Sequence, residues 1–152
     1  MKRIVEYKPI RHEGYPALIK ECSVLYDGSL NTPEMVSQFV RDNYCKNELE
    51  ENVYVLATNI KNKPLGFFCV SHGTSSCSLI SPREVFQRAL LLGADNVILI
   101  HNHPSGDVTP SKEDINVTKM VKEAGNIVGV KLLDHIIVSD TDYCSFSQQK
   151  IL

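Results

Sequence analysis

The sequence lacks several features that would place it in other protein classes. Its apolar runs, such as residues 97–100, are far shorter than the ~20 residues that a helix needs to cross a bilayer. Basic residues are not in excess, because 16 Lys and Arg stand against 18 Asp and Glu and give a net charge of −2. This balance argues against direct, tight binding of nucleic acid along its phosphate backbone.

Cysteine usage and the first residues exclude further classes. The five cysteines are an odd number without a Cys-x-x-Cys pair, so they predict neither a disulfide framework nor a thiolate zinc site. Residues 1–6 contain an acid where the apolar stretch of a secretion signal would lie. We therefore expect a cytoplasmic protein without a membrane partner.

Length and patterning predict how the chain is divided. The 152 residues, of which 43% are hydrophobic, suffice for one domain with its own core. In residues 1–31, short apolar pairs among Pro and Gly suggest irregular structure or an edge strand. We therefore expect an N-terminal extension over residues 1–31 and a regular domain over residues 32–152.

Helical and strand patterns alternate from residue 32 onward. Thr32 and Pro33 have the residue types of a helix start, and both Ser81–Glu84 and Ser111–Asp114 have the pattern of a capping box. The expected elements are a helix over 32–44, a hairpin of strands 53–57 and 65–70, a helix from 81 to a stop at 93, a buried strand over 96–100, a helix from about 110 to 124, strands near 127–132 and 134–138, and a polar tail. This order predicts an α/β (α+β) fold, with helices packed on a mixed sheet.

Two histidines follow the buried strand with one residue between them. In an extended segment, alternate side chains project to the same side, so His101 and His103 aim at one point while Asn102 faces away. Asp114, at the start of the next helix, is a rigid mount for a third ligand. Two histidines and one carboxylate leave a fourth position for water, which is the composition of a catalytic zinc site.

Each part of this pattern also has an ordinary structural explanation. A capping box accounts for Ser111 and Asp114 without a metal, and residues 104–106 are common turn residues. His-x-His alone is weak evidence for metal binding. The metal site is favoured by the joint order of an apolar strand, His-x-His, a Gly/Pro loop and Ser-x-x-Asp at a helix start.

This joint pattern resembles the RadC family of bacterial JAMM (also called MPN) metalloprotease domains. The superfamily pattern is an upstream Glu, then His-x-His, seven residues, Ser, two residues and Asp, and the spacing from His103 through Ser111 to Asp114 fits it. Flanking segments that also resemble RadC are Gly73-Thr74, Pro82-Arg83-Glu84, Ala94 and Leu132–Val138. The resemblance covers residues 32–146 and implies the JAMM/MPN, cytidine-deaminase-like architecture.

The resemblance also implies a function, namely zinc-dependent hydrolysis of peptide or isopeptide bonds. By this resemblance, His101, His103 and Asp114 would hold one Zn²⁺, and Ser111 would stabilise the oxyanion. Glu51 would accept the proton from the activated water and pass it to the leaving amine. The partner would be a peptide or protein substrate.

Some assignments stay open at the level of the residues. Nothing in the sequence itself selects Glu51 over Glu48 or Glu50 as the proton acceptor. In the family pattern, Asp134 and His135 begin a core strand near the site. There, Asp134 either orients a zinc-bound imidazole or belongs to a pair that is satisfied structurally.

Two alternative functions are compatible with the same residues. One is a metal-binding accessory factor without catalysis, acting in DNA repair or on mobile elements. The other is a metal-dependent nuclease, because Asp107 and Glu113 could recruit a second metal. Longer RadC proteins resemble a fusion with an N-terminal helix-hairpin-helix region that binds DNA, and residues 1–31 are too short for one. The family name reflects a proposed role in DNA repair.

Overall fold

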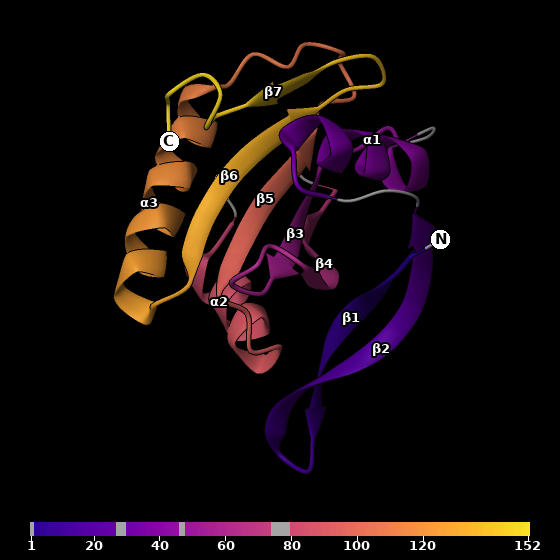
Figure 1. Ribbon diagram of the computed structural model, residues 1–152, viewed down its shortest axis with the longest axis vertical. Helices are drawn as coiled ribbons and strands as arrows, with labels where there is room; N and C mark the ends of the chain where they lie inside the picture. The colour runs from indigo at the N-terminus through magenta and orange to yellow at the C-terminus, as the bar shows by residue number, and fades with distance from the viewer. Residues whose placement is uncertain (1, 27–29, 46–47, 74–79) are drawn as a thin grey trace.

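The computed structural model describes residues 2–26, 30–45, 48–73 and 80–152, and within these ranges the chain forms a mixed sheet with three helices (Figure 1). The strands are β1 (Lys2–His12), β2 (Tyr15–Tyr26), β3 (Asn52–Thr58), β4 (Pro64–His72), β5 (Asn96–Asn102), β6 (Lys131–Val138) and β7 (Tyr143–Ser145). The helices are α1 (Pro33–Tyr44), α2 (Pro82–Leu91) and α3 (Lys112–Val128).

All seven strands belong to one sheet in the order β2-β1-β4-β3-β5-β6-β7. The β1/β4 and β5/β6 pairs are parallel, and the other neighbours are antiparallel. The sheet is therefore mixed and is flanked by helices, which confirms the predicted fold class. No helix in the described ranges is long and apolar enough to cross a membrane.

The helices cover both faces of the sheet, and the strands alternate accordingly. On one face, Val97 and Leu99 of β5 pack with side chains of α2 and α3. On the other face, Ile98 and Ile100 pack with side chains of α1. β5 is thus buried on both sides, as its unbroken apolar run predicts.

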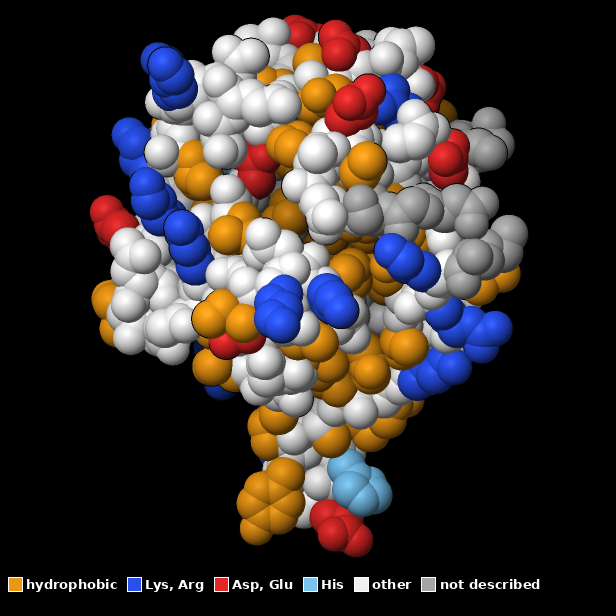
Figure 2. Space-filling model, viewed as in Figure 1, with side chains coloured by type: hydrophobic (Ala, Val, Ile, Leu, Met, Phe, Trp, Pro, Cys, Tyr) orange, Lys and Arg blue, Asp and Glu red, His pale blue; other side chains and the backbone are white. Residues whose placement is uncertain are grey.

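The N-terminal residues form a hairpin with an edge strand, so of the two expectations the edge strand is confirmed and the irregular structure is wrong. β1 and β2 pair from Lys2↔Tyr26 to His12↔Tyr15. The two loop residues, Glu13 (φ 49°) and Gly14 (φ 88°), are both in the left-handed region, as a type I′ turn requires. β2 is an edge strand, and the hairpin projects beyond the rest of the molecule (Figures 1 and 2). The division of the chain at residue 31 stays a prediction, although β1 pairs with β4.

The C-terminal third also differs from its predicted elements. α3 continues through Gly125 to Val128 and ends at Gly129, where φ is 78°. One strand, β6, replaces the two that were expected, and β7 lies in the expected polar tail. Ser81 caps α2 by position only, since its side chain makes no capping hydrogen bond.

Candidate metal centre

His101 and His103 lie at the carboxyl end of β5 and face the same region. His101 shares the face of Val97 and Leu99, toward α3, and only 1% of its surface is exposed. The ring of His103 meets that of His101 edge-on, with centroids 4.4 Å apart. The two imidazoles are therefore close enough to bind one ion.

Asp114 approaches both imidazoles from the first turn of α3. Its Oδ1 lies 3.6 Å from Nδ1 of His101, and its Oδ2 lies 4.0 Å from Nε2 of His103. The same Oδ2 accepts a hydrogen bond from the Ser111 N–H, while Ser111 Oγ accepts one from the Asp114 N–H. The predicted capping box is confirmed, and it holds the carboxylate beside the two histidines.

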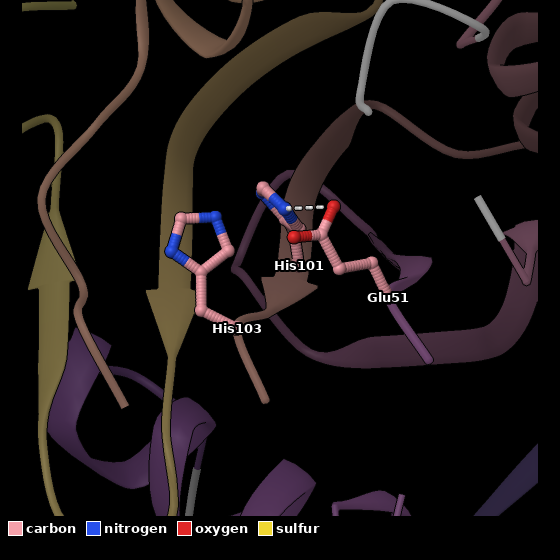
Figure 3. Close-up of side chains that lie close together, drawn as sticks. All are labelled: Glu51, His101 and His103. Carbon is pink, nitrogen blue, oxygen red and sulfur yellow. Dashed lines mark ion pairs between the residues drawn. The ribbon is translucent and has the colours of Figure 1, made fainter. Parts of the chain in front are cut away.

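Glu51 approaches His101 from the residue just before β3, at the ring nitrogen that Asp114 does not approach. β3 pairs antiparallel with β5, with Val53 opposite His101, so Glu51 lies beside the histidine pair. Its Oε2 is 3.8 Å from Nε2 of His101 (Figure 3). Glu50 instead pairs with His72, at 3.7 Å, and Glu48 accepts a long hydrogen bond from Asn52. Of these three glutamates, Glu51 is the one whose carboxylate lies beside a site histidine.

Glu51, His101 and His103 form a group that could hold a metal ion. Each offers one ligand atom, and the three atoms lie within 4.8 Å of one another. Imidazole nitrogen with carboxylate oxygen is a donor set that suits zinc, so the residues fit a zinc ion. The group contains Glu51 where the resemblance implies Asp114 as the third ligand, and Asp114 lies against both imidazoles. Which carboxylate is the ligand stays a prediction.

The surroundings of the two histidines affect how each imidazole could bind a metal ion. Burial, reinforced by the neighbouring His135, lowers the pKa of His101 to about 3, so its imidazole is neutral at pH 7. Nδ1 of His103 lies 2.6 Å from the carbonyl oxygen of Asp107. Because a carbonyl only accepts, Nδ1 of His103 donates to it, and Nε2 is the ring nitrogen that would bind a ligand.

The buried ring of His135 lies between the rings of His101 and Phe146. Its centroid is 5.9 Å from that of His101 and 4.6 Å from that of Phe146. Burial lowers its pKa to about 4, so it is neutral too. Its Nδ1 lies 2.6 Å from Oγ1 of Thr118, and that hydroxyl is 2.5 Å from the carbonyl oxygen of Asp114. Thr118 is not among the residues predicted from the sequence, although its place four residues after Asp114 on a helix could have indicated it.

Asp134 makes its hydrogen bonds away from the imidazoles. Its carboxylate accepts from the hydroxyl of Ser145 and from the N–H groups of His135 and Ser147. Burial raises its pKa, opposed by these hydrogen bonds. They fasten β7 and the turn after it to β6, which is the structural alternative considered for this residue.

Comparisons with known proteins show the family of the chain. A family model described as "RadC-like JAB domain" matches residues 30–151. A UPF0758 protein of Caldanaerobacter subterraneus is 50% identical over 91 residues, which are 60% of this chain and 39% of that protein. One of Symbiobacterium thermophilum is 41% identical over 123 residues, or 81% of this chain and 52% of that protein. The chain thus spans about half or less of the length of these relatives. Because the family model matches most of its residues, the chain belongs to the RadC family of JAB-domain proteins.

Proposed function

We propose that this chain is a zinc-dependent hydrolase of peptide or isopeptide bonds. One observation supports the proposal. At the end of β5, two imidazoles lie within 4.0 Å of the Asp114 carboxylate, and one of them also lies within 4.0 Å of the Glu51 carboxylate. One of these imidazoles is kept neutral by burial. The relatives are UPF0758 proteins, a name that specifies no reaction, so the reaction is argued from the site.

His101, His103 and Asp114 would hold the ion in this proposal. Bound there, Zn²⁺ supplies a Lewis acid that polarises the scissile carbonyl and lowers the pKa of a water to about 7. The Ser111 cap fixes Asp114, and the Asp107 carbonyl fixes the tautomer of His103. These contacts orient the ligands before the ion arrives.

Glu51 and Ser111 would act on the substrate. The Glu51 carboxylate takes the proton from the attacking water and passes it to the nitrogen of the leaving amine. Ser111 Oγ accepts from the Asp114 N–H, which leaves its own proton for the oxyanion of the tetrahedral intermediate. The substrate on this proposal is a peptide or a protein.

The first test is metal content by elemental analysis, on protein purified without chelator or His-tag. We expect about one zinc per chain in the parent and in Glu51→Gln, and none in Asp114→Ala. Asp42→Ala, which removes an exposed acid from α1, is the matched control and should keep zinc. If Glu51→Gln loses zinc and Asp114→Ala keeps it, then Glu51 is the metal ligand and Asp114 is not. No zinc in the parent after zinc is added back would reject the proposal.

The second test is hydrolysis of a panel of peptide and isopeptide substrates. Glu51→Gln should abolish cleavage while it keeps zinc. A parent that holds zinc and cleaves none of the panel, but cuts DNA, would favour the nuclease. Zinc binding without either activity would favour the accessory factor.

Ser111→Ala tests the oxyanion role and should slow turnover by about two to three orders of magnitude. It also removes a helix cap, which costs about 1 kcal/mol of stability. Thr32→Ala is the matched control, because Thr32 Oγ1 caps α1 by accepting from the Met35 N–H. If both variants lose stability and neither loses turnover, Ser111 is a helix cap alone.

A further inference from the structure

The side chain of Asn102 holds the backbone on both sides of Glu51. Its Oδ1 accepts a hydrogen bond of 2.7 Å from the Asn52 N–H, and its Nδ2 donates one of 3.0 Å to the Glu50 carbonyl. Asn102 is 3% exposed, so neither bond competes with bulk water. The two peptide groups that flank Glu51 are therefore held by one side-chain amide.

These two bonds extend the contact between β3 and β5 beyond their backbone pairing. That pairing runs from Thr58↔Asn96 to Val53↔His101, and Glu51 precedes the first residue of β3. Asn102 itself is anchored from the other side, where it pairs with Val138 of β6. The adjacent His103 N–H donates to the Val138 carbonyl at 2.8 Å. Through Asn102, strand β5 thus holds Glu51, which would otherwise lie at the fraying end of β3.

We propose that Asn102 is the positioning residue for Glu51, an inference that rests on the proposed function. The middle residue of His-x-His faces away from the two imidazoles and holds the backbone that carries Glu51. This keeps Oε2 of Glu51 near Nε2 of His101, at the 3.8 Å seen here. One short segment, residues 101–103, thereby determines the positions of both histidines and of Glu51.

The chemistry of this contact requires a carboxamide. An amide side chain offers an acceptor to the Asn52 N–H and a donor to the Glu50 carbonyl at the same time. Asn102→Asp keeps the acceptor and the size, but it turns a carboxylate oxygen toward a carbonyl oxygen. Asn102→Ala removes both bonds without adding a charge and serves as a second variant.

Hydrogen exchange tests the contact directly. In Asn102→Asp, the Asn52 amide should exchange at least about tenfold faster than in the parent, because its acceptor is no longer held. The His103 amide, bonded to Val138, should stay as protected as before. Asn96→Asp is the matched control, since Nδ2 of this buried asparagine at the other end of β5 donates to the Asn59 carbonyl. It should leave Asn52 protected.

The effect on Glu51 is read from its carboxyl carbon by NMR on ¹³C-labelled protein. The signal is identified by its disappearance in Glu51→Gln. Added zinc should shift it in the parent and in Asn96→Asp, and the shift should fall by half or more in Asn102→Asp and Asn102→Ala. Zinc should stay bound in both Asn102 variants, because the proposed ligands are unchanged.

The outcomes separate this inference from the proposed function. Unchanged protection of Asn52 in both Asn102 variants would overturn it, and so would a zinc-induced Glu51 shift equal to that of the parent. Loss of protection at His103 together with Asn52 would mean general unfolding of β5 and would also overturn it. A parent that binds no zinc would reject the proposed function, while the exchange of Asn52 would still report on the contact.

Discussion

At the scale of the residue, Thr118 connects two parts of the site through one hydroxyl. Its Oγ1 is 2.5 Å from the Asp114 carbonyl and 2.6 Å from Nδ1 of His135. Within the described residues, Nε2 of His135 is buried without a hydrogen-bond partner. Thr118→Val would therefore leave both ring nitrogens unpaired, and we expect the free energy of unfolding to fall by about 1–3 kcal/mol. Urea denaturation measures this.

Thr58 provides the control for that prediction. It is fully buried, and its Oγ1 has no hydrogen-bond partner among the residues described. Thr58→Val removes an unsatisfied hydroxyl at constant shape, so stability should stay within about 0.5 kcal/mol or rise. If the two valine variants lose equal stability, the Thr118 hydroxyl does not brace His135.

The same scale shows which site residues could be predicted. His101, His103 and Asp114 lie within one short segment, so their spacing predicts that they meet. Glu51 is about fifty positions away, and its approach depends on the pairing of Val53 with His101, which no local pattern contains. The bonds of Asn102 depend on the same pairing. Long-range register is what residue spacing leaves undetermined.

At the scale of the element, Gly125 is a packing residue inside α3. A Cβ at this position would lie 2.4 Å from the Val130 carbonyl oxygen and 3.0 Å from Cζ of Phe86. The clash outweighs the higher helix propensity of alanine, which is worth about 1 kcal/mol. Gly125→Ala should therefore lower the free energy of unfolding by about 1–3 kcal/mol, as measured by thermal or urea denaturation.

Gly129→Asn is the comparison for Gly125→Ala. Gly129 ends the helix with φ 78°, and a Cβ there would meet nothing within 4 Å. Asparagine adopts this left-handed conformation readily, so the loss should be below about 1 kcal/mol. A larger loss in Gly129→Asn than in Gly125→Ala would contradict this division of roles.

The two glycines also explain why the end of α3 was predicted wrongly. A glycine after a helical pattern usually marks its end, and Gly125 satisfies that rule in sequence alone. The helix continues because Gly125 allows the close approach of Val130 and Phe86, and Gly129 supplies the left-handed residue. The one-turn error moves residues 127 and 128 from an expected strand into the helix.

At the scale of the whole molecule, folding encloses imidazoles that stay neutral. Burial lowers the pKa of His101 to about 3 and that of His135 to about 4, whereas an unfolded chain titrates near 6.5. Below pH ~6.5 the unfolded chain binds protons that the folded chain excludes. The two imidazoles therefore make their full contribution to the free energy of unfolding of the metal-free protein above this pH. That contribution falls as the pH drops toward the pKa values of the folded protein.

We therefore expect the metal-free protein to lose roughly 2–3 kcal/mol of unfolding free energy between pH 7.5 and pH 5.5, or about 1.4 kcal/mol for each of the two histidines. Urea denaturation at a series of pH values measures this loss. His135→Phe should halve the pH dependence, because it removes one of the two buried imidazoles. Stability independent of pH over this range would mean that the two buried imidazoles accept protons as readily in the folded protein as in the unfolded chain. His101 would then bind zinc in competition with protons near neutral pH, and burial would give it no advantage as a ligand.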